Sequence, residues 1–469
     1  MIPHKKLKTW DFFLGTLQFH TPYHISSAQG NMETDAGLLR NSNGMIYIPG
    51  TSIAGALKAR AQEICNDFEL IKAIFGYQSG ESGQKSRIYI EDTYINSHVS
   101  TSVKDGVAID RKLGSARDKA KYDLEISPAN LSFRLLIKLE MREDDDEEIQ
   151  KLVLALMKDF RDGRIKLGAK KSSGLGSCSF NFNWYQLDFN EHNTVAEYLV
   201  NKDITTLTKM DDKNSPSTAR TDELACEIEM EAINSPLLIK SGEEGDDHDA
   251  VFTTVQQGGN ETEYIPGSSI KGVIRAHAEK ILRTLGGNAC DITDSANSCN
   301  KKLDDSLRGI SKEERYQEIL ENSCSICNLF GNSYLASRIQ FDDAFFEEAP
   351  VKKPFDHVAI DRFTGGAMEG KLFSDLPVVK GKFKIRFVVK RPTYFDRVLI
   401  AFILRDLMEG FPPIRFGYGK SKGYGELKFI KASINDAKLE KGGSIRDTFG
   451  IGSTEKWWEG EVTDEQRTD

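Results

Sequence analysis

The sequence predicts an α+β protein of two tandem domains, each a ferredoxin-like, RNA-recognition-like sheet with long insertions between its elements. One observation behind this prediction is an internal repeat. Tyr-Ile-Pro-Gly-Thr-Ser-Ile-Ala-Gly at residues 47–55 returns as Tyr-Ile-Pro-Gly-Ser-Ser-Ile-Lys-Gly at residues 264–272. The other is the order of elements, since each half reads as strand, helix, strands, helix, glycine-rich loop and strand.

Three further landmarks recur in the same order in both halves. They are Ile/Leu-Phe-Gly at 74–76 and 329–331, Val-Ala-Ile-Asp-Arg at 107–111 and 358–362, and a glycine-lysine loop at 166–176 and 415–425. The offset between copies drifts from 217 at the prolines to 251 at the aspartates and 249 at the glycine loops. Two homologous domains with loops of unequal length explain this drift.

Alternating or β-branched residues predict the strands, and apolar residues at helical spacing predict the helices. In the first half we expect strands at 12–20, 86–90, 131–139 and 177–182, and helices at 52–68 and 147–162. In the second half we expect strands at 225–233, 337–341, 381–389 and 425–430, and helices at 269–285 and 394–410.

A polar stretch at 190–221 without clear periodicity is the expected linker. We therefore expect domains at 1–215 and 222–440, followed by an acidic tail at 441–469. No apolar run reaches the roughly 18 residues of a membrane span, and the N-terminus lacks the apolar core of a signal peptide. These features predict a soluble cytoplasmic protein.

The formal net charge of −9 argues mildly against a nucleic-acid partner, because lysine and arginine supply the affinity for phosphate. The charge is segregated, however. Acidic residues gather at 143–148, 243–247 and 455–469, and basic residues gather at 111–121, 164–171 and 415–422. The last two basic runs fall on the repeated glycine loops.

The Pro-Gly-Ser/Thr-Ser-Ile element places free backbone amides and hydroxyls at a helix start, which suits a phosphate. The alternative is ordinary helix capping. The glycine loops combine small residues with lysines, which also suits phosphate, and the alternative is a glycine-rich hairpin with solvated lysines. Gly-Lys-Ser at 419–421 lacks the spacing of a Walker A loop, so ATP hydrolysis is not indicated.

A cysteine-rich part of the second half predicts a structural zinc site. The candidate ligands are His277, Cys290, Cys299, Cys324 and Cys327. The first repeat has no cysteine pair before Phe75-Gly76, and Arg60 stands where the second has its histidine. Zinc would hold the polar insertion at 286–322, whereas the alternative is buried thiols and a surface histidine.

These motifs together resemble the RAMP-superfamily backbone subunit of CRISPR type III effector complexes. That subunit polymerises along the guide RNA and, in many members, cuts the target RNA. The residues that carry the resemblance are Ile-Pro-Gly-Ser-Ser-Ile-Lys-Gly at 265–272, Leu-Phe-Gly at 329–331, Ile-Asp-Arg-Phe-Thr-Gly at 360–365 and the second glycine loop. They occur in family order over most of the chain, and the fused pair is similar to the type III-D branch.

The resemblance implies partners, namely guide RNA, complementary target RNA and other subunits of the complex. It also implies a thumb-like hairpin after each Ile-Asp-Arg, at roughly 111–123 and 362–376. Base pairing would read sequence, while the protein grips backbone and shape. The implied RNA-binding residues are Ser52, Lys58, Arg60, Arg111, Lys170, Lys171, Ser269, Lys271, Arg275, Arg362, Lys420 and Lys422.

In such subunits target cleavage depends on an aspartate before Pro-Gly-Ser-Ser, which makes Asp35 and Asp249 the catalytic candidates. Asp35 lies 14 residues ahead of Pro49, and Asp249 is chosen over Asp246 and Asp247. A carboxylate there could hold Mg²⁺ or Mn²⁺ that aligns a scissile phosphate with the neighbouring ribose 2′-hydroxyl. The alternative at each position is an acidic, solvated loop.

The sequence therefore predicts a guide-RNA-bound, metal-dependent endoribonuclease subunit. One alternative is a non-catalytic RNA-binding scaffold of the same complex. Another is a guide-processing endonuclease that uses histidine for general acid–base chemistry. Both repeats carry the backbone-type motifs, and His24 is the only histidine near the first candidate site, which disfavours the last alternative.

Overall fold

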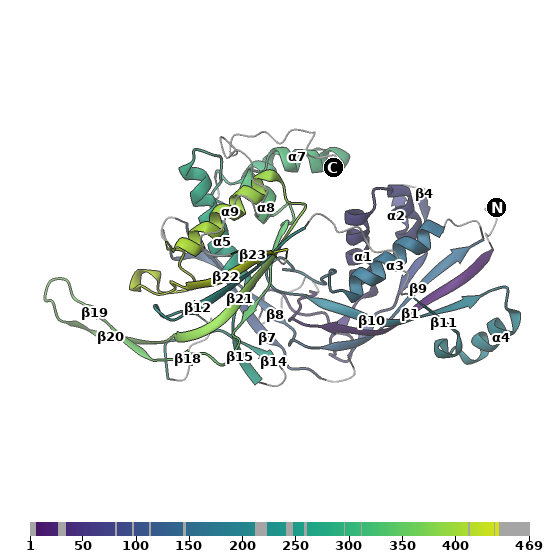
Figure 1. The fold of residues 1–469 in the computed structure, drawn as a ribbon, viewed down its shortest axis with the longest axis horizontal. Coiled ribbons are helices and arrows are strands. Elements are labelled where there is room, and N and C mark those ends of the chain that lie inside the picture. Colours follow the sequence, from purple (N-terminus) through teal and green to yellow (C-terminus); the bar gives the residue numbers. More distant parts are fainter. Residues whose placement is uncertain are drawn as a thin grey trace.

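A computed structural model gives the architecture. It describes residues 6–26, 34–79, 82–95, 98–111, 114–143, 147–211, 223–240, 247–257, 260–294, 296–310, 312–410, 413–435 and 437–439. The predicted acidic tail lies outside these residues, as does 212–221 of the expected linker. The α+β class is confirmed, since each half holds an antiparallel sheet covered by helices (Figure 1).

The first sheet is centred on β1 (Leu7–Phe19), whose alternating pattern turns Phe13, Leu17 and Phe19 into the core. Two helices, α1 (Gly50–Ile64) and α3 (Glu147–Arg161), cover that face. The strands lie in the order β11 (Thr208–Met210), β10 (Cys178–Asp188), β1, β9 (Ser132–Arg142) and β5 (Ile88–Ile90).

The second sheet repeats this plan around β12 (Glu223–Ala232). Its strands lie in the order β16 (Ile339–Phe341), β21 (Val378–Lys390), β12, β22 (Lys428–Ile434) and β23 (Ala437–Leu439), with β18 (Val351–Lys352) also paired to β21. Helices α5 (Gly267–Thr284) and α9 (Tyr394–Glu409) cover its core face. The four shared strands therefore have one order in both halves, β10-β1-β9-β5 and β22-β12-β21-β16.

Shorter elements fill the connections. In the first half these are β2 (Tyr47–Ile48), α2 (Phe68–Phe75), β3 (Tyr77–Ser79), β4 (Ser82–Gln84), β6 (Thr93–Tyr94), α4 (His192–Asn201) and η1 (Ile204–Thr206). In the second half they are β13 (Ala250–Val251), β14 (Thr254–Gln257), β15 (Asn260–Ile265), α6 (Cys299–Ser306), α7 (Lys312–Glu321), α8 (Ser325–Phe330), β17 (Ala344–Phe345) and η2 (Lys420–Lys422).

The repeated Phe-Gly step has a backbone cause. Helices α2 and α8 end at Gly76 and Gly331, whose φ angles are 72° and 82°. A Cβ at Gly331 would stand 2.9 Å from the Leu335 carbonyl oxygen, so both conformation and space favour glycine. Lys58 and Arg275 donate to the carbonyl oxygens of these glycines, at 3.5 and 2.9 Å, and thereby tie each long helix to the step.

One expectation needs correction, and one insertion proves to have structure of its own. The described part of the expected linker is not a plain linker, because it forms α4, η1 and β11. Tyr198 of α4 packs against Trp10 and Phe12 on the outer face of the first sheet. The polar insertion at 286–322 likewise contains α6 and α7, which share a small apolar cluster of Leu303, Leu307 and Ile319.

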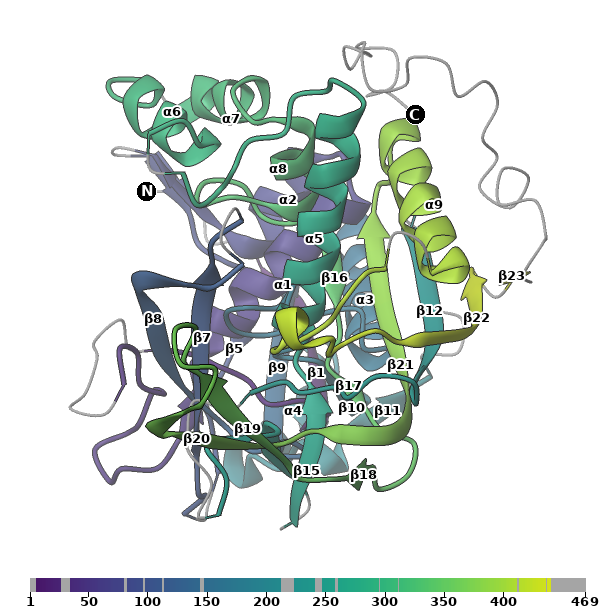
Figure 2. The ribbon, with the colours of Figure 1, turned by 90° about the vertical axis from the view of Figure 1, so that its left-hand side faces the viewer.

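Each half projects a β-hairpin. The hairpins are β7 (Ser102–Ile109) with β8 (Ala116–Ile126), and β19 (Phe355–Ile360) with β20 (Ala367–Leu376). The first strand of each hairpin ends at the isoleucine of Ile-Asp-Arg, Ile109 or Ile360. The hairpins therefore begin before residues 111 and 362, where they were predicted to start. The first lies at the junction of the halves, and the second extends outward with Phe363 fully exposed (Figures 1 and 2).

Candidate nucleic-acid interface and metal centre

The two candidate catalytic aspartates occupy equivalent places. Asp35 Oδ2 accepts a hydrogen bond from the Asp123 backbone N–H at 3.0 Å, and Ala36 bridges the next residue of β8 in parallel. Asp249 Oδ2 accepts from the Ser374 N–H at 2.7 Å, and Ala250 bridges the next residue of β20 in parallel. Both aspartates are exposed beside the base of a hairpin. The geometry therefore pairs Asp249 with Asp35.

The surroundings of the two aspartates differ. Near Asp35, Lys121 lies 3.5 Å from both Asp105 and Asp123, and burial followed by the hydrogen bond with Asp123 raises the pKa of Asp105. In the second half the equivalent of Asp123 is Ser374, whose hydroxyl lies 3.2 Å from His248 Nδ1. The second half keeps a carboxylate opposite this serine, since Asp356 pairs with Ser374 as Asp105 pairs with Asp123. The two surroundings therefore differ by one carboxylate, Asp123, and one lysine, Lys121.

Below the second site lies a polar network that sequence reasoning missed. The carboxylate of Asp375, 1% exposed, lies 3.0 Å from His357 Nε2 and 2.8 Å from Lys422 Nζ. The Tyr424 hydroxyl lies 3.0 Å from the same imidazole. Burial is the main cause, and the Asp375 charge the second, that raises the pKa of Tyr424 to about 12. Lys422, a predicted RNA contact, thus turns inward. The matching carboxylate position in the first half is Leu124, so repeat comparison could have revealed the network.

The predicted phosphate sites at the helix starts already have a carboxylate partner. The Gly50 N–H donates to Asp92 Oδ1 at 2.8 Å, and the Gly267 N–H donates to Asp343 Oδ1 at 2.7 Å. This arrangement favours the capping alternative for these amides. Ser52 and Ser269 lie half-buried in the first turn of these helices.

Three predicted RNA contacts are engaged inside the protein. One is Arg111, which donates to the buried Glu279 at 3.2 Å. Arg60, 4% exposed, donates to Asp159 and Glu63 at 2.8 and 2.7 Å. Arg275 is also buried and donates to Glu279 at 3.0 Å. These guanidiniums neutralise carboxylates and pack the helices, so a structural role explains them.

Four of the candidate lysines gather, with Arg111, where the two halves meet; they are Lys170, Lys171, Lys271 and Lys420. The pKa of Lys271 is lowered to about 7, mainly by burial and in addition by the charges of Arg275 and Lys170. Burial also lowers the pKa of Lys171, with a smaller effect from the Lys390 charge. The pKa of Lys420 is lowered by burial and, to a lesser extent, by the Arg111 charge. Cations held close enough to repel one another form a surface that an anion would stabilise. Arg362 is exposed on the second hairpin, apart from this junction.

Four of the five zinc candidates come together. The sulfur atoms of Cys290, Cys299, Cys324 and Cys327 all lie within 4.8 Å of one another. His277 instead places Nε2 2.7 Å from Asp406 Oδ2. Four thiolates at this spacing fit tetrahedral zinc. The cysteines come from the loop after α5 and from the starts of α6 and α8, so an ion there would join the insertion to the core.

Comparison with known proteins agrees with the repeated architecture. The family model described as the RAMP superfamily matches residues 16–179 and 233–428. A protein of Methanocaldococcus jannaschii named CRISPR system Cms endoribonuclease Csm3 is 22% identical over 191 residues, which cover 35% of this chain and 76% of that protein. Within the described residues, no helix has the length and apolarity needed to cross a membrane.

Proposed function

Because this chain belongs to the RAMP superfamily, we propose that it is a guide-RNA-binding backbone subunit of a CRISPR type III effector complex that cleaves guide-paired target RNA. The relative's printed name supports both the complex and the endoribonuclease activity. The observation that carries the proposal is the equivalence of Asp35 and Asp249, each exposed at the base of a hairpin.

In this proposal the guide backbone lies along the junction, near Arg111, Lys170, Lys171, Lys271 and Lys420. Phosphate would supply negative charge to the four lysines, whereas Arg111 already pairs with Glu279. The hairpins would reach the paired target, with Arg362 on the outer one. The network around Asp375 would hold the second hairpin on its glycine loop.

For cleavage, each aspartate would present a carboxylate oxygen beside the target backbone. A divalent ion there would supply charge stabilisation of the phosphate. The ribose 2′-oxygen would attack the adjacent phosphorus and lose its proton to solvent, and the bond from phosphorus to the 5′-oxygen would break as that oxygen takes a proton from solvent. The products are a 2′,3′-cyclic phosphate and a 5′-hydroxyl. We further propose a structural zinc at the four cysteines, domains at residues 1–215 and 222–440, and a cytoplasmic location.

Asparagine substitutions separate charge from shape, because an amide oxygen can still accept the Asp123 or Ser374 N–H bond. Asp35→Asn should lower the cleavage rate at one set of target positions by at least about 100-fold, and Asp249→Asn should do the same at another set. The assay maps target RNA products from the assembled complex with Mg²⁺ or with EDTA. Unchanged cutting in the double variant would refute both assignments, and equal cutting in EDTA would refute the metal.

The scaffold alternative makes a different prediction for the same assay. It requires guide-dependent target binding with no cuts that depend on either aspartate. Asp247→Asn, two residues before Asp249, is the matched control and should leave the products unchanged.

A further inference from the structure

The cysteine cluster of the second half lies beside a buried carboxylate. Arg275 joins the two, because its Nη2 donates to Cys327 Sγ at 3.3 Å and its Nε donates to Glu279 Oε1 at 3.0 Å. Glu279 is fully buried, and Arg283 lies 3.6 Å from its second carboxylate oxygen. A carboxylate removed from water in this way needs cations close to it. A continuous chain of contacts therefore runs from the cysteines to Glu279.

The hairpin of the first half reaches the same carboxylate. Arg111 lies two residues beyond the end of β7, and its Nε donates to Glu279 Oε2 at 3.2 Å. The two residues are 168 positions apart in the sequence. One buried charge is therefore shared between α5 of the second half and the hairpin β7–β8 of the first.

A second contact joins this hairpin to the loop that follows Cys290. Arg117 of β8 donates to the backbone carbonyl oxygen of Thr293. The turn at Thr293 is fixed by Asp291 Oδ1, which accepts from the Thr293 N–H at 2.9 Å and from its hydroxyl at 2.6 Å. Arg283 donates to the Cys290 carbonyl oxygen at 2.8 Å and so ties the loop to α5. The hairpin thus contacts both the buried carboxylate and the loop of the cysteine cluster.

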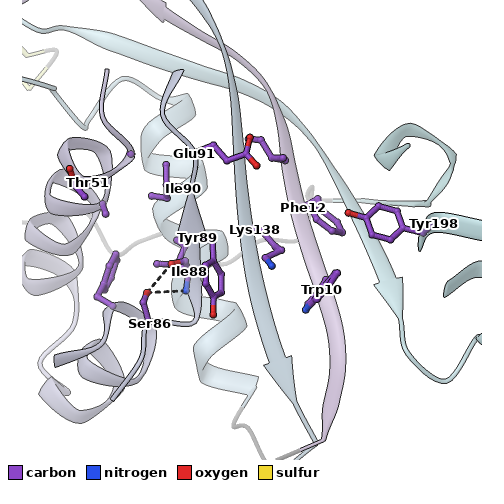
Figure 3. A pocket seen from close by; sticks show the side chains of 14 residues that line it. Trp10, Phe12, Thr51, Ser86, Ile88, Tyr89, Ile90, Glu91, Lys138 and Tyr198 are labelled. Atoms are coloured by element: carbon purple, nitrogen blue, oxygen red, sulfur yellow. Dashed lines mark hydrogen bonds between the residues drawn. The ribbon is translucent and has the colours of Figure 1, made fainter. Parts of the chain in front are cut away.

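The first half builds the same Phe-Gly step without the cysteine pair. Figure 3 shows Ser86 beside Ile88, where the serine hydroxyl donates to the Ile88 carbonyl oxygen at 2.8 Å. In the second half the Ser337 hydroxyl donates to the Ile339 carbonyl oxygen at 2.6 Å. The residue of α1 that matches Glu279 is Gln62. The step itself therefore does not need the cysteines, and the carboxylate accompanies them.

Charge gives the connection a direction. Zn²⁺ bound by four thiolates is a net anion, and Glu279 adds to its negative charge. Arg275, Arg283 and Arg111 balance this charge. Without the metal the thiols are neutral at pH 7, and the three guanidiniums then face a single carboxylate. Arg111 is the one that does not belong to α5, so the excess of positive charge weakens its contact.

We propose that metal binding at the four cysteines holds the first hairpin in place, through Arg111 on Glu279 and Arg117 on the cysteine loop. The base of this hairpin supplies the Asp123 N–H that donates to Asp35. A metal in the second half therefore helps to position the candidate site of the first. The inference rests on the zinc proposed above, and both arginines are positioning residues.

Hydrogen exchange of the full-length protein tests this connection. Amide exchange is measured by mass spectrometry on the zinc-loaded protein and after a chelator has removed the metal. Peptides from residues 102–126 should exchange at least about fivefold faster without zinc. Peptides from residues 355–376 of the second hairpin are the matched control and should exchange equally in both states. Equal exchange of the first hairpin in both states would overturn the proposal.

The reverse measurement keeps the metal in the protein. Because coupling between two sites is reciprocal, a hairpin that has lost its contacts should weaken zinc binding. Arg111→Met together with Arg117→Met should raise the zinc dissociation constant at least about fivefold in competition with a chelator. Arg362→Met together with Lys371→Met, on the second hairpin, is the control and should leave this constant unchanged.

An unchanged zinc affinity of the Arg111 and Arg117 double variant would overturn the proposal, as would a protein that binds no zinc. Neither measurement uses RNA or follows cleavage. The cleavage proposal and this one can therefore fail separately.

Discussion

Replacing Lys271 by methionine removes an ammonium group whose pKa is lowered from 10.5 to about 7. Its neighbours Arg275 and Lys170 add like charge to the cost of burial. The folded protein releases this proton near pH 7, whereas the unfolded chain keeps it to about pH 10.5. Methionine has a similar stem without the charge, so the variant reports the cost of the ammonium.

The sign follows from proton counting. Between about pH 7 and 10.5 the unfolded state binds more protons, so the free energy of unfolding rises with pH. One group contributes at most about 1.4 kcal/mol per pH unit, and at most about 5 kcal/mol over the window. Below pH 7 both states are protonated and the destabilisation is complete.

The assay is urea unfolding of the free protein at pH 7, 8, 9 and 10, with the wild type compared with Lys271→Met. The variant should be more stable at pH 7, and the difference should shrink steadily toward pH 10. Lys280→Met, on the exposed face of the same helix, is the control and should show no such convergence. A difference that stays constant with pH, or grows, would refute the like-charge crowding at the junction.

Three further predictions concern stability and metal. Gly331→Ala should destabilise the protein by at least about 1–2 kcal/mol, because Gly331 has a positive φ and close backbone neighbours. Gly272 lies on an open helix face, so Gly272→Ala should be neutral or stabilising. Equal losses of unfolding free energy in urea would contradict this prediction. In metal analysis of the purified protein, Cys299→Ser should lack the one equivalent of zinc that His277→Ala retains. The reverse pattern would exclude the set of four cysteines as the zinc ligands. Arg60→Met should cost about 2 kcal/mol, because it removes one of the two arginines that pair with the buried Asp159 and leaves Arg164 alone with it. Lys72→Met, at an exposed pair, should change little. A stable Arg60 variant would argue against a contribution of the buried ion pair.

The repeated motifs and periodicity were enough to predict the four strands that each sheet shares with the other and the four long helices, because those elements bury one face and show it in their spacing. The strands β11, β18 and β23 were not predicted. Helix α4 was missed because it is held by tertiary contacts of Tyr198 with Trp10 and Phe12, not by a pattern of its own.

The candidate site was predictable to a lesser depth. The spacing of the cysteines predicted that they cluster, but only the structure separates them from His277. A lysine or arginine near a motif reads as a phosphate contact, and the sequence does not reveal that Arg60 meets Asp159 or that Lys422 meets Asp375. Those carboxylates lie 99 and 47 residues away along the chain.

The outer hairpin leaves Phe363, Leu372 and Ile360 in water. Side chains of this kind lower colloidal stability, so light scattering by the free protein should rise with concentration and with kosmotropic salt. Phe363→Ser should delay the onset of turbidity. Turbidity measurements therefore report whether a binding partner covers the tip of this hairpin.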